Sequence, residues 1–237
     1  MKSILFTFVS VFAYTAVYAA EPDSNIKTSF PMAVEGVRLI EMDSKPTQEQ
    51  IHQAIGHATR YLITKQNPKG SWGSARNTKE LNIYDPGSTH DAYLAGTSAL
   101  GLAALLETEA MLNKEEMASK TDEFGIDRNA LTKAINKGEE WLLTYLPKVR
   151  RSSSDAIYNI WGHAYGLQAL VRMLERFPDD ADRCEKIRAA IREQIGFIER
   201  FECLDGGWCY YDFEHMMKKT AGSPNSFVSA TVLLALW

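Results

Sequence analysis

Six segments of the chain have a helical period of hydrophobic and polar positions, and the segments are of two kinds. Three carry a single apolar stripe, which is typical of a helix with one face on a core. They begin near residues 47, 129 and 180. The other three, near residues 91–112, 156–177 and 226–237, are richer in small residues. The segment 91–112 is apolar on most faces, so we expect it to be buried on most sides. The pattern predicts an all-α fold in which outer amphipathic helices alternate with inner apolar helices.

Polar residues and prolines mark the ends of the amphipathic segments. Thr47 with Gln50 forms a capping box ahead of the first segment, and the acidic run 179–182 offers N-cap carboxylates ahead of the third. Pro68 and Pro147 follow the first and second segments, where a proline stops a helix. These signals place the helix ends to within a few residues.

The three outer helices share an internal pattern. Each has Ala-Ile followed seven residues later by an aromatic residue and a Leu or Ile, beginning at Ala54, Ala134 and Ala190. Seven residues are close to two turns, so each set lies on one helix face. The pattern predicts repeated helix pairs, with residues 113–128 as an exposed charged insertion. Matching the trailing leucines of the inner helices places Thr97, Tyr165 and Thr231 at equivalent positions.

A short motif follows the first outer helix and returns after the third. Its first copy contains Gln66, Gly70 and Trp72, and its second contains Gly206 and Trp208, with Glu202 at the position of the glutamine. We interpret the motif as a structural joint between an outer and an inner helix. The glutamine caps backbone groups, the glycine permits the turn and the tryptophan packs between repeats.

The first copy resembles the QW motif of the terpenoid cyclases, the superfamily of squalene–hopene cyclase and the prenyltransferase β-subunit. Residues 159–170 are similar to an inner helix of exported, planctomycete-type proteins with prenyltransferase or squalene-oxidase repeats. The resemblance covers residues 47–237 and implies an α/α toroid. The family's ring has about twelve helices and only about six are expected here, so the chain is expected to be an incomplete ring, with closure by dimerisation as the alternative.

The sequence lacks the catalytic motifs that the resemblance leads us to look for. The cyclase acid motif Asp-x-Asp-Asp and the magnesium-binding Asp-Asp-x-x-Asp are both missing from the chain. Zinc-ligand residue types do gather near the second motif, but they come from one loop and not in the family's order, so we interpret them as ordinary loop residues. They are Cys203, Asp205, Cys209, Asp212 and His215. No metal and no cofactor are predicted.

Inner helices of a toroid run parallel, so their N-termini are expected to meet at one mouth. We expect a site there, because His, Asp and Tyr converge on this end. The candidate catalytic residues are His163, Asp91 and His90, and the candidate ligand-binding residues are Trp161, Tyr165 and Tyr211. His163 has a second interpretation, as a core histidine bonded to a neighbouring helix. The loops that lead to the mouth add Tyr84, Asp85 and Tyr210.

The N-terminus has the pattern of a targeting signal. Residues 1–19 combine Lys2 with a short apolar core, which predicts a cleaved signal peptide and a periplasmic or extracellular protein. Residues 20–46 are expected to form a flexible leader. The mature chain shows no membrane span, and the net charge of −4 gives no footprint for nucleic acid. Of the three cysteines, Cys203 and Cys209 either bridge locally or stay free.

These observations lead to one functional expectation and two alternatives. We expect an exported repeat protein that binds an apolar small molecule or a protein partner and lacks the cyclase acid. The first alternative is an (α/α) toroid enzyme such as a polysaccharide lyase. The second is a terpene cyclase whose catalytic half is missing. Whether the protein is an enzyme stays open at this point.

Overall fold

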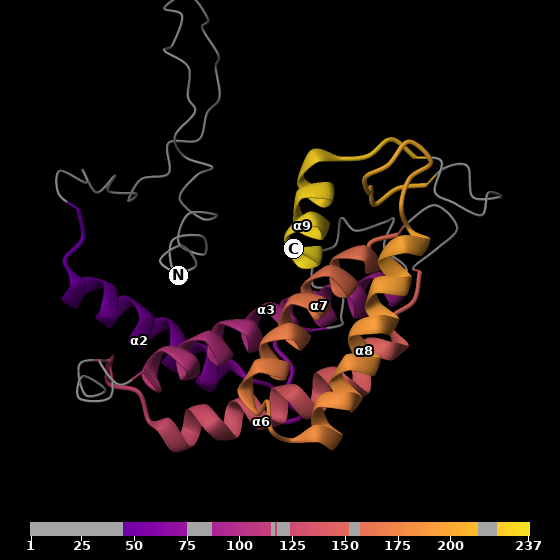
Figure 1. The fold of residues 1–237 in the computed structure, drawn as a ribbon. Coiled ribbons are helices and arrows are strands. Elements are labelled where there is room, and N and C mark those ends of the chain that lie inside the picture. The colour runs from indigo at the N-terminus through magenta and orange to yellow at the C-terminus, as the bar shows by residue number, and fades with distance from the viewer. Residues whose placement is uncertain (1–44, 75–86, 115–116, 118–123, 152–156, 213–221) are drawn as a thin grey trace, which may run out of the picture. The chain divides into compact units, whose positions relative to one another are not determined.

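A computed structural model of the protein describes residues 45–74, 87–114, 117, 124–151, 157–212 and 222–237. The predicted signal peptide and almost all of the leader lie outside these residues. Residues 46–237 form one compact unit, and the elements of its described part are helices joined by loops (Figure 1). Its elements are α2 (Gln48–Lys65), α3 (Gly87–Leu112), α6 (Arg128–Tyr145), the short 3₁₀ helix η2 (Leu146–Lys148), α7 (Asn159–Arg176), α8 (Ala181–Arg200) and α9 (Ser226–Leu236). The all-α prediction is confirmed, and each of the six expected helices is present.

The predicted capping residues hold the helix N-termini. Thr47 and Gln50 exchange hydrogen bonds, with Thr47 Oγ1 accepting from the Gln50 amide at 3.2 Å and Gln50 Oε1 accepting from the Thr47 amide at 2.9 Å. Asp180 caps α8 by accepting from the Arg183 amide at 3.0 Å. Both caps satisfy N–H groups that have no partner within the helix.

The inner helices α3 and α7 lie side by side and run in the same direction. Tyr93 contacts Tyr158 near their N-terminal ends, and Arg172 pairs with Glu107 near their C-terminal ends. On its other side α7 packs against α9, where Trp161 stacks on Phe227. The expected parallel packing is therefore present between α3 and α7.

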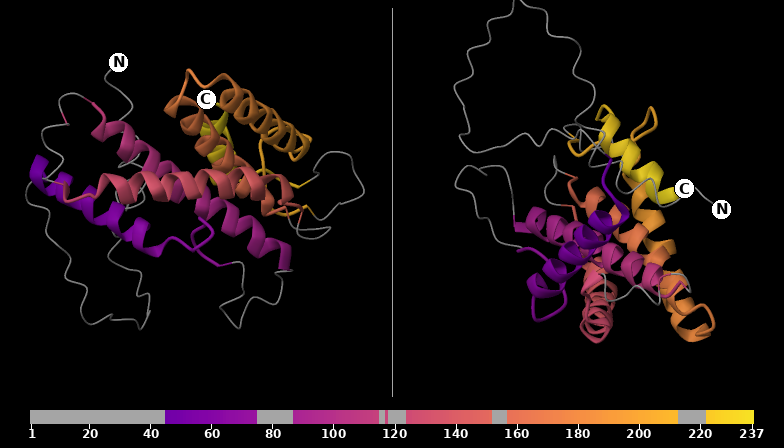
Figure 2. Two further views of the ribbon diagram at one scale, coloured as in Figure 1. Left: turned by 90° about the horizontal axis from the view of Figure 1, so that it is seen from below. Right: turned by 90° about the vertical axis from the view of Figure 1, so that its left-hand side faces the viewer.

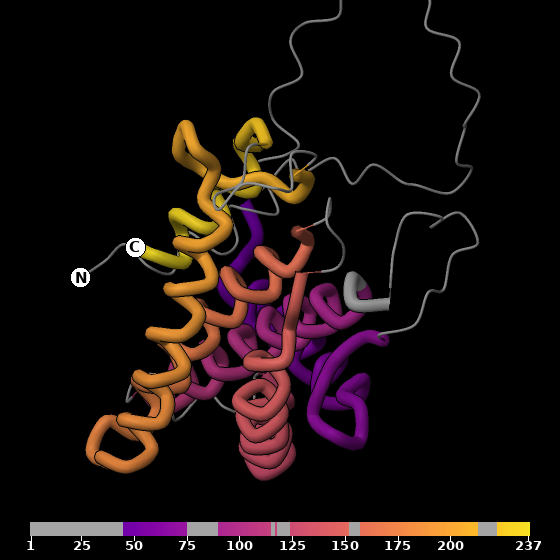
Figure 3. Tube along the Cα trace, turned by 90° about the vertical axis from the view of Figure 1, so that its right-hand side faces the viewer, coloured from indigo at the N-terminus to yellow at the C-terminus, as the bar shows by residue number. Residues whose placement is uncertain are grey.

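Outer helices pack antiparallel on the inner ones. Seen from below, α6 crosses in front of α3 (Figure 2). The end of α6 lies at the start of α3, where the Tyr145 hydroxyl donates to Asp91 Oδ1 at 2.6 Å. In the same way α8 runs beside α7 (Figure 3), since Arg183 at its start bonds the Met173 carbonyl near the end of α7. In each of these two pairs an amphipathic helix therefore packs antiparallel on a helix rich in small residues.

Small residues allow α3 and α7 to approach closely. An added Cβ on Gly162 would lie 3.3 Å from the Ala92 carbonyl oxygen, and one on Gly96 would lie 3.4 Å from the Tyr165 ring. Side chains larger than these would separate the two backbones. The Gly and Ala content of the inner helices is therefore a packing requirement of this contact.

The expectation that residues 113–128 are an exposed insertion is wrong for its last part. Phe124 and Ile126 are buried in the core. The Arg60 guanidinium fixes this turn by donating to the carbonyl oxygens of Phe124 and Gly125, both at 2.8 Å. The stretch is charged in sequence overall, so the pattern did not indicate that Phe124 and Ile126 are buried. Their burial stabilises the fold.

Candidate functional site

The first motif loop joins three helices. The Trp72 indole Nε1 donates to the Leu62 carbonyl oxygen of α2 at 2.8 Å, and the Trp72 amide donates to Ser98 Oγ of α3 at 2.9 Å. Gln66 Nε2 donates to the Gly70 carbonyl oxygen at 3.0 Å and to the Ala134 carbonyl oxygen of α6 at 2.8 Å. The loop therefore binds α2, α3 and α6 through hydrogen bonds.

The Trp72 indole also fills the space between two glycines. A Cβ added to Gly101 of α3 would lie 3.1 Å from the ring, and one added to Gly138 of α6 would lie 3.3 Å from it. Trp72 is buried. This contact agrees with the interpretation of the tryptophan as a packing residue.

The second motif loop repeats the two tryptophan hydrogen bonds of the first. Trp208 Nε1 donates to the Ile198 carbonyl oxygen of α8 at 2.8 Å, and the Trp208 amide donates to Ser229 Oγ of α9 at 2.9 Å. Gly70 and Gly206 both have positive φ, at 103° and 85°, a region that favours glycine. The two loops thus share one geometry.

These bonds correct the expected register of the inner helices. Ser98 and Ser229 bind the two tryptophans in the same way, so they are the equivalent pair. Matching Thr97 with Thr231 is wrong by three residues. Both helices are apolar on nearly every face, so hydrophobic pattern alone could not determine which face turns toward the loop.

Aromatic side chains gather near the N-terminal ends of α3, α7 and α9. We call the following residues the aromatic cluster: Tyr93, Tyr158, Trp161, Tyr165, Tyr210, Tyr211 and Phe227. Trp161 stacks on Phe227 with centroids 5.8 Å apart and planes 15° apart, and on Tyr165 at 5.8 Å and 21°. Tyr210 then connects Phe227 to Tyr158. Ring contacts therefore run without a break from α3 across α7 to α9.

Part of the aromatic cluster faces solvent. Phe227 is 52% exposed and Tyr93 is 40% exposed, whereas Trp161 and Tyr165 are half-buried. The structure thus unites the predicted ligand residues Trp161, Tyr165 and Tyr211 in one cluster. Sequence reasoning missed Phe227, because a phenylalanine at the start of an apolar helix reads as core.

His163 lies beneath this surface in the core between α7 and α8. Its side chain is 0% exposed, and its ring stacks on Phe197 with centroids 4.4 Å apart. Nδ1 lies 2.7 Å from Gln194 Oε1 and Nε2 lies 3.2 Å from Asn159 Nδ2, so the neutral ring donates to Gln194 and accepts from Asn159. Burial lowers the pKa of His163 from 6.5 to about 4, although the Gln194 bond opposes part of this effect. Both ring nitrogens are occupied, so neither can exchange a proton with a ligand at the mouth.

Asp91 and His90 differ in their surroundings from His163. Both are partly buried at the start of α3. Asp91 accepts the hydrogen bond from the Tyr145 hydroxyl, and burial together with this bond raises the pKa of Tyr145. Asp91 therefore ties α3 to α6. Tyr84, Asp85 and His215 lie outside the described residues.

Four of the five zinc-ligand candidates near the second motif lie within the described residues: Cys203, Asp205, Cys209 and Asp212. Within the described part of the chain no three His, Cys, Asp or Glu residues could hold one metal ion. Cys203 and Cys209 are free thiols with their sulfur atoms 3.6 Å apart. Burial raises the pKa of Cys203 to about 12 and also raises that of Cys209, so both stay protonated. Asp212 is buried and pairs with Arg151 at 3.1 Å.

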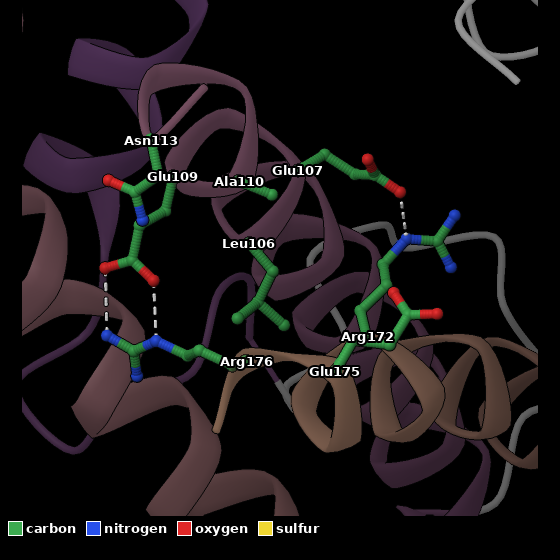
Figure 4. Close-up of a pocket in the computed structure, with 8 residues that line it drawn as sticks. All are labelled: Leu106, Glu107, Glu109, Ala110, Asn113, Arg172, Glu175 and Arg176. Atoms are coloured by element: carbon green, nitrogen blue, oxygen red, sulfur yellow. Dashed lines mark hydrogen bonds and ion pairs between the residues drawn. The ribbon is translucent and has the colours of Figure 1, made fainter. Parts of the chain in front are cut away.

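A pocket of about 180 Å³ lies at the other end of α3 and α7 (Figure 4). Its charged residues are largely engaged with one another: Arg176 pairs with Glu109 at 2.6 Å and Arg172 pairs with Glu107 at 2.6 Å. These ion pairs bind the two helix ends together. We assign the pocket a structural role on that basis.

Comparison with protein-family models, with curated proteins and with solved structures finds no match. No helix in the described part of the chain is long and apolar enough to cross a membrane.

Proposed function

We propose that the chain is an exported helical repeat module of the terpenoid-cyclase toroid type that binds an apolar ligand on its aromatic cluster. The observation that carries this proposal is the continuous row of ring contacts across α3, α7 and α9, part of which faces solvent. Aromatic faces held in this way offer a large apolar area at little entropic cost. An isoprenoid-like chain or a fused ring system fits such a surface.

The polar groups around the cluster favour binding over catalysis. His163 is buried and bonded at both ring nitrogens. Asp91 is engaged by Tyr145 and Asp212 by Arg151. The sequence also lacks the acid motif of the cyclases. These observations support the proposal of a non-catalytic binding role.

Titration with farnesol, followed by calorimetry, tests the proposal. Trp161→Ala or Phe227→Ala should weaken binding roughly tenfold or more, because each removes an aromatic face worth about 1–3 kcal/mol of buried apolar surface. Tyr61→Ala is the matched control, since Tyr61 is exposed on α2, outside the cluster. Absence of binding, or equal affinity in all variants, would contradict the proposal, as would turnover of squalene or a prenyl diphosphate.

A carbohydrate is the second candidate ligand, because near-parallel rings such as Trp161 and Phe227 also suit the apolar face of a sugar. Polygalacturonate with and without calcium distinguishes this case. Saturable binding that Trp161→Ala abolishes, together with formation of an unsaturated product, would establish a lyase. If the chain neither binds nor cleaves polygalacturonate but binds farnesol, the first proposal is supported.

A further inference from the structure

The main chain of the second motif loop can be compared with that of the first residue by residue. With the two tryptophans aligned, Cys203 corresponds to Asn67 and Cys209 corresponds to Gly73. The Asn67 amide donates to the carbonyl oxygen four residues later at 2.8 Å, and the Cys203 amide does the same at 2.9 Å. The carbonyl oxygens of Asn67 and Cys203 each accept from the amide three residues later, at 2.8 and 3.0 Å. The two loops therefore follow the same course at these positions.

A side-chain hydrogen bond crosses the first loop between the two matched positions. Asn67 Nδ2 donates to the Gly73 carbonyl oxygen at 2.8 Å and to Ser71 Oγ at 2.9 Å. These bonds hold the start of the loop to the residue that follows the tryptophan. The second loop has a cysteine in place of Asn67 and a glycine, Gly207, in place of Ser71, so it cannot form this polar link.

The two cysteine side chains meet across the second loop between the same two positions. The Cys203 thiol donates to Cys209 Sγ with the sulfur atoms 3.6 Å apart, and both side chains are buried. The sulfur atoms of a disulfide lie about 2 Å apart, so closure requires an approach of about 1.5 Å. Rotation of the two side chains about their Cα–Cβ bonds supplies a movement of this size.

We propose that Cys203 and Cys209 form a disulfide that closes the second motif loop. The oxidant is a small-molecule disulfide or a thiol oxidoreductase, as exported proteins meet, so the proposal rests on the export stated in the proposed function. One cysteine thiolate attacks the disulfide of the oxidant and releases one thiol. The second thiolate attacks the resulting mixed disulfide and releases the other thiol. The two cysteines thus lose two protons and two electrons, and the oxidant is reduced to two thiols.

Burial of the two thiols indicates when the disulfide forms. Only a thiolate attacks, and burial raises the pKa of Cys203 to about 12 and also raises that of Cys209. Reaction within the folded loop is therefore slow. The disulfide forms while the chain is still unfolded and its thiols are exposed. After folding, the same burial shields the disulfide from external thiols.

Cys184 cannot replace either partner. It lies near the start of α8, whereas Cys203 follows the end of this helix. The helix between them is about 24 Å long, but the Cα atoms of a disulfide lie within about 7 Å of each other. The Cys184 thiol instead donates to the Phe177 carbonyl oxygen at 3.4 Å. The oxidised protein is therefore expected to keep Cys184 as a free thiol.

The position of the disulfide connects it to the aromatic cluster. Tyr210 and Tyr211 follow Cys209 directly in the chain, and both rings contact Tyr158. A bond between Cys203 and Cys209 would anchor the start of the segment that carries these two rings. The second loop would then have a covalent link where the first has the Asn67 hydrogen bonds.

Alkylation and mass spectrometry of the full chain test the proposal. The chain is unfolded and reduced, refolded in a mixture of reduced and oxidised glutathione, and alkylated in denaturant. We expect Cys184 to be alkylated, while Cys203 and Cys209 are protected. Trypsin leaves both protected cysteines in one peptide, residues 201–218, whose mass should be lower by two hydrogen atoms than that of the reduced peptide.

Stability provides a second measurement. The disulfide should lower the equilibrium constant for unfolding in urea roughly tenfold or more relative to the reduced chain. Cys203→Ser should abolish this difference, and circular dichroism checks that the variant is folded. Cys184→Ser is the matched control, because it removes a buried thiol outside the loop and should keep the full difference.

Three results would overturn the proposal. One is alkylation of all three cysteines after refolding with oxidised glutathione. Another is a disulfide that includes Cys184. The third is equal stability of the oxidised and reduced chains, which would mean that the bond does not fit the folded loop. None of these measurements uses a ligand, so a failure of farnesol to bind would contradict the proposed function and leave the disulfide untouched.

Discussion

The neutral histidine of the core makes a measurable prediction about acid stability. His163 has a pKa of about 4 in the folded protein and an ordinary value of 6.5 when unfolded. As the pH falls, the unfolded chain takes up a proton first, so the folded state loses stability from pH 6.5 down to about pH 4. At roughly 1.4 kcal/mol per pH unit, the whole loss is about 3 kcal/mol, of which about 2 kcal/mol falls between pH 7 and pH 5.

Urea denaturation followed by tryptophan fluorescence measures this loss. The His163→Gln variant provides the comparison, because it keeps a polar side chain but cannot take up a proton. We expect its free energy of unfolding to change by about 2 kcal/mol less than that of the original protein between pH 7 and pH 5. The other histidines are present in both proteins, so their contributions cancel.

Two results would refute this reasoning. One is an equal pH dependence of the free energy of unfolding in the two proteins. The other is an NMR titration in which the His163 ring protons of the folded protein report a pKa near 6.5. The first result would mean that the ring is not the source of the pH dependence. The second would mean that the core admits the charged ring.

Three further substitutions test a buried hydrogen bond and the packing of two glycines, and each is measured by the free energy of unfolding in urea. Ser98→Ala should cost about 1–3 kcal/mol, because it leaves the buried Trp72 amide without its acceptor. Gly166→Ala should cost about 1–3 kcal/mol, because its Cβ would lie 2.5 Å from Leu146. Gly196→Ala, with no atom within 4 Å of the added Cβ, should instead stabilise α8 by roughly 0.5–1 kcal/mol; a loss comparable to that of Gly166→Ala would contradict the packing argument.

Local signals were enough to predict the helices. The capping box at Thr47 and the acidic cap at Asp180 act within a few residues of the chain, and each is present in the structure. The rotation of α3 and α9 could not be predicted, because these helices are apolar on almost every face. Only the hydrogen bonds of Ser98 and Ser229 reveal which side turns toward the motif loops.

The sequence predicted that aromatic residues gather near the N-terminal ends of the inner helices, and their role as a site stays a prediction. Trp161 and Tyr165 lie together because they are four residues apart on α7, and Tyr211 joins them through its ring contacts with Tyr158 and Tyr210. The sequence left two roles open for His163, since a histidine among small residues suits both a core and a site. Its environment depends on Gln194, a residue 31 positions away on another helix. Contacts over that distance are decided by tertiary packing.

Most partners of the first motif loop are main-chain atoms. Trp72 donates to the carbonyl oxygen of Leu62 and Gln66 to that of Ala134, so neither bond depends on the side chain at the receiving position. Among these partners, Ser98 contributes a side chain. A helix pair joined in this way can be duplicated, and its copies can diverge in sequence. The motif loop requires of the adjoining helix little more than a helical backbone and a small side chain.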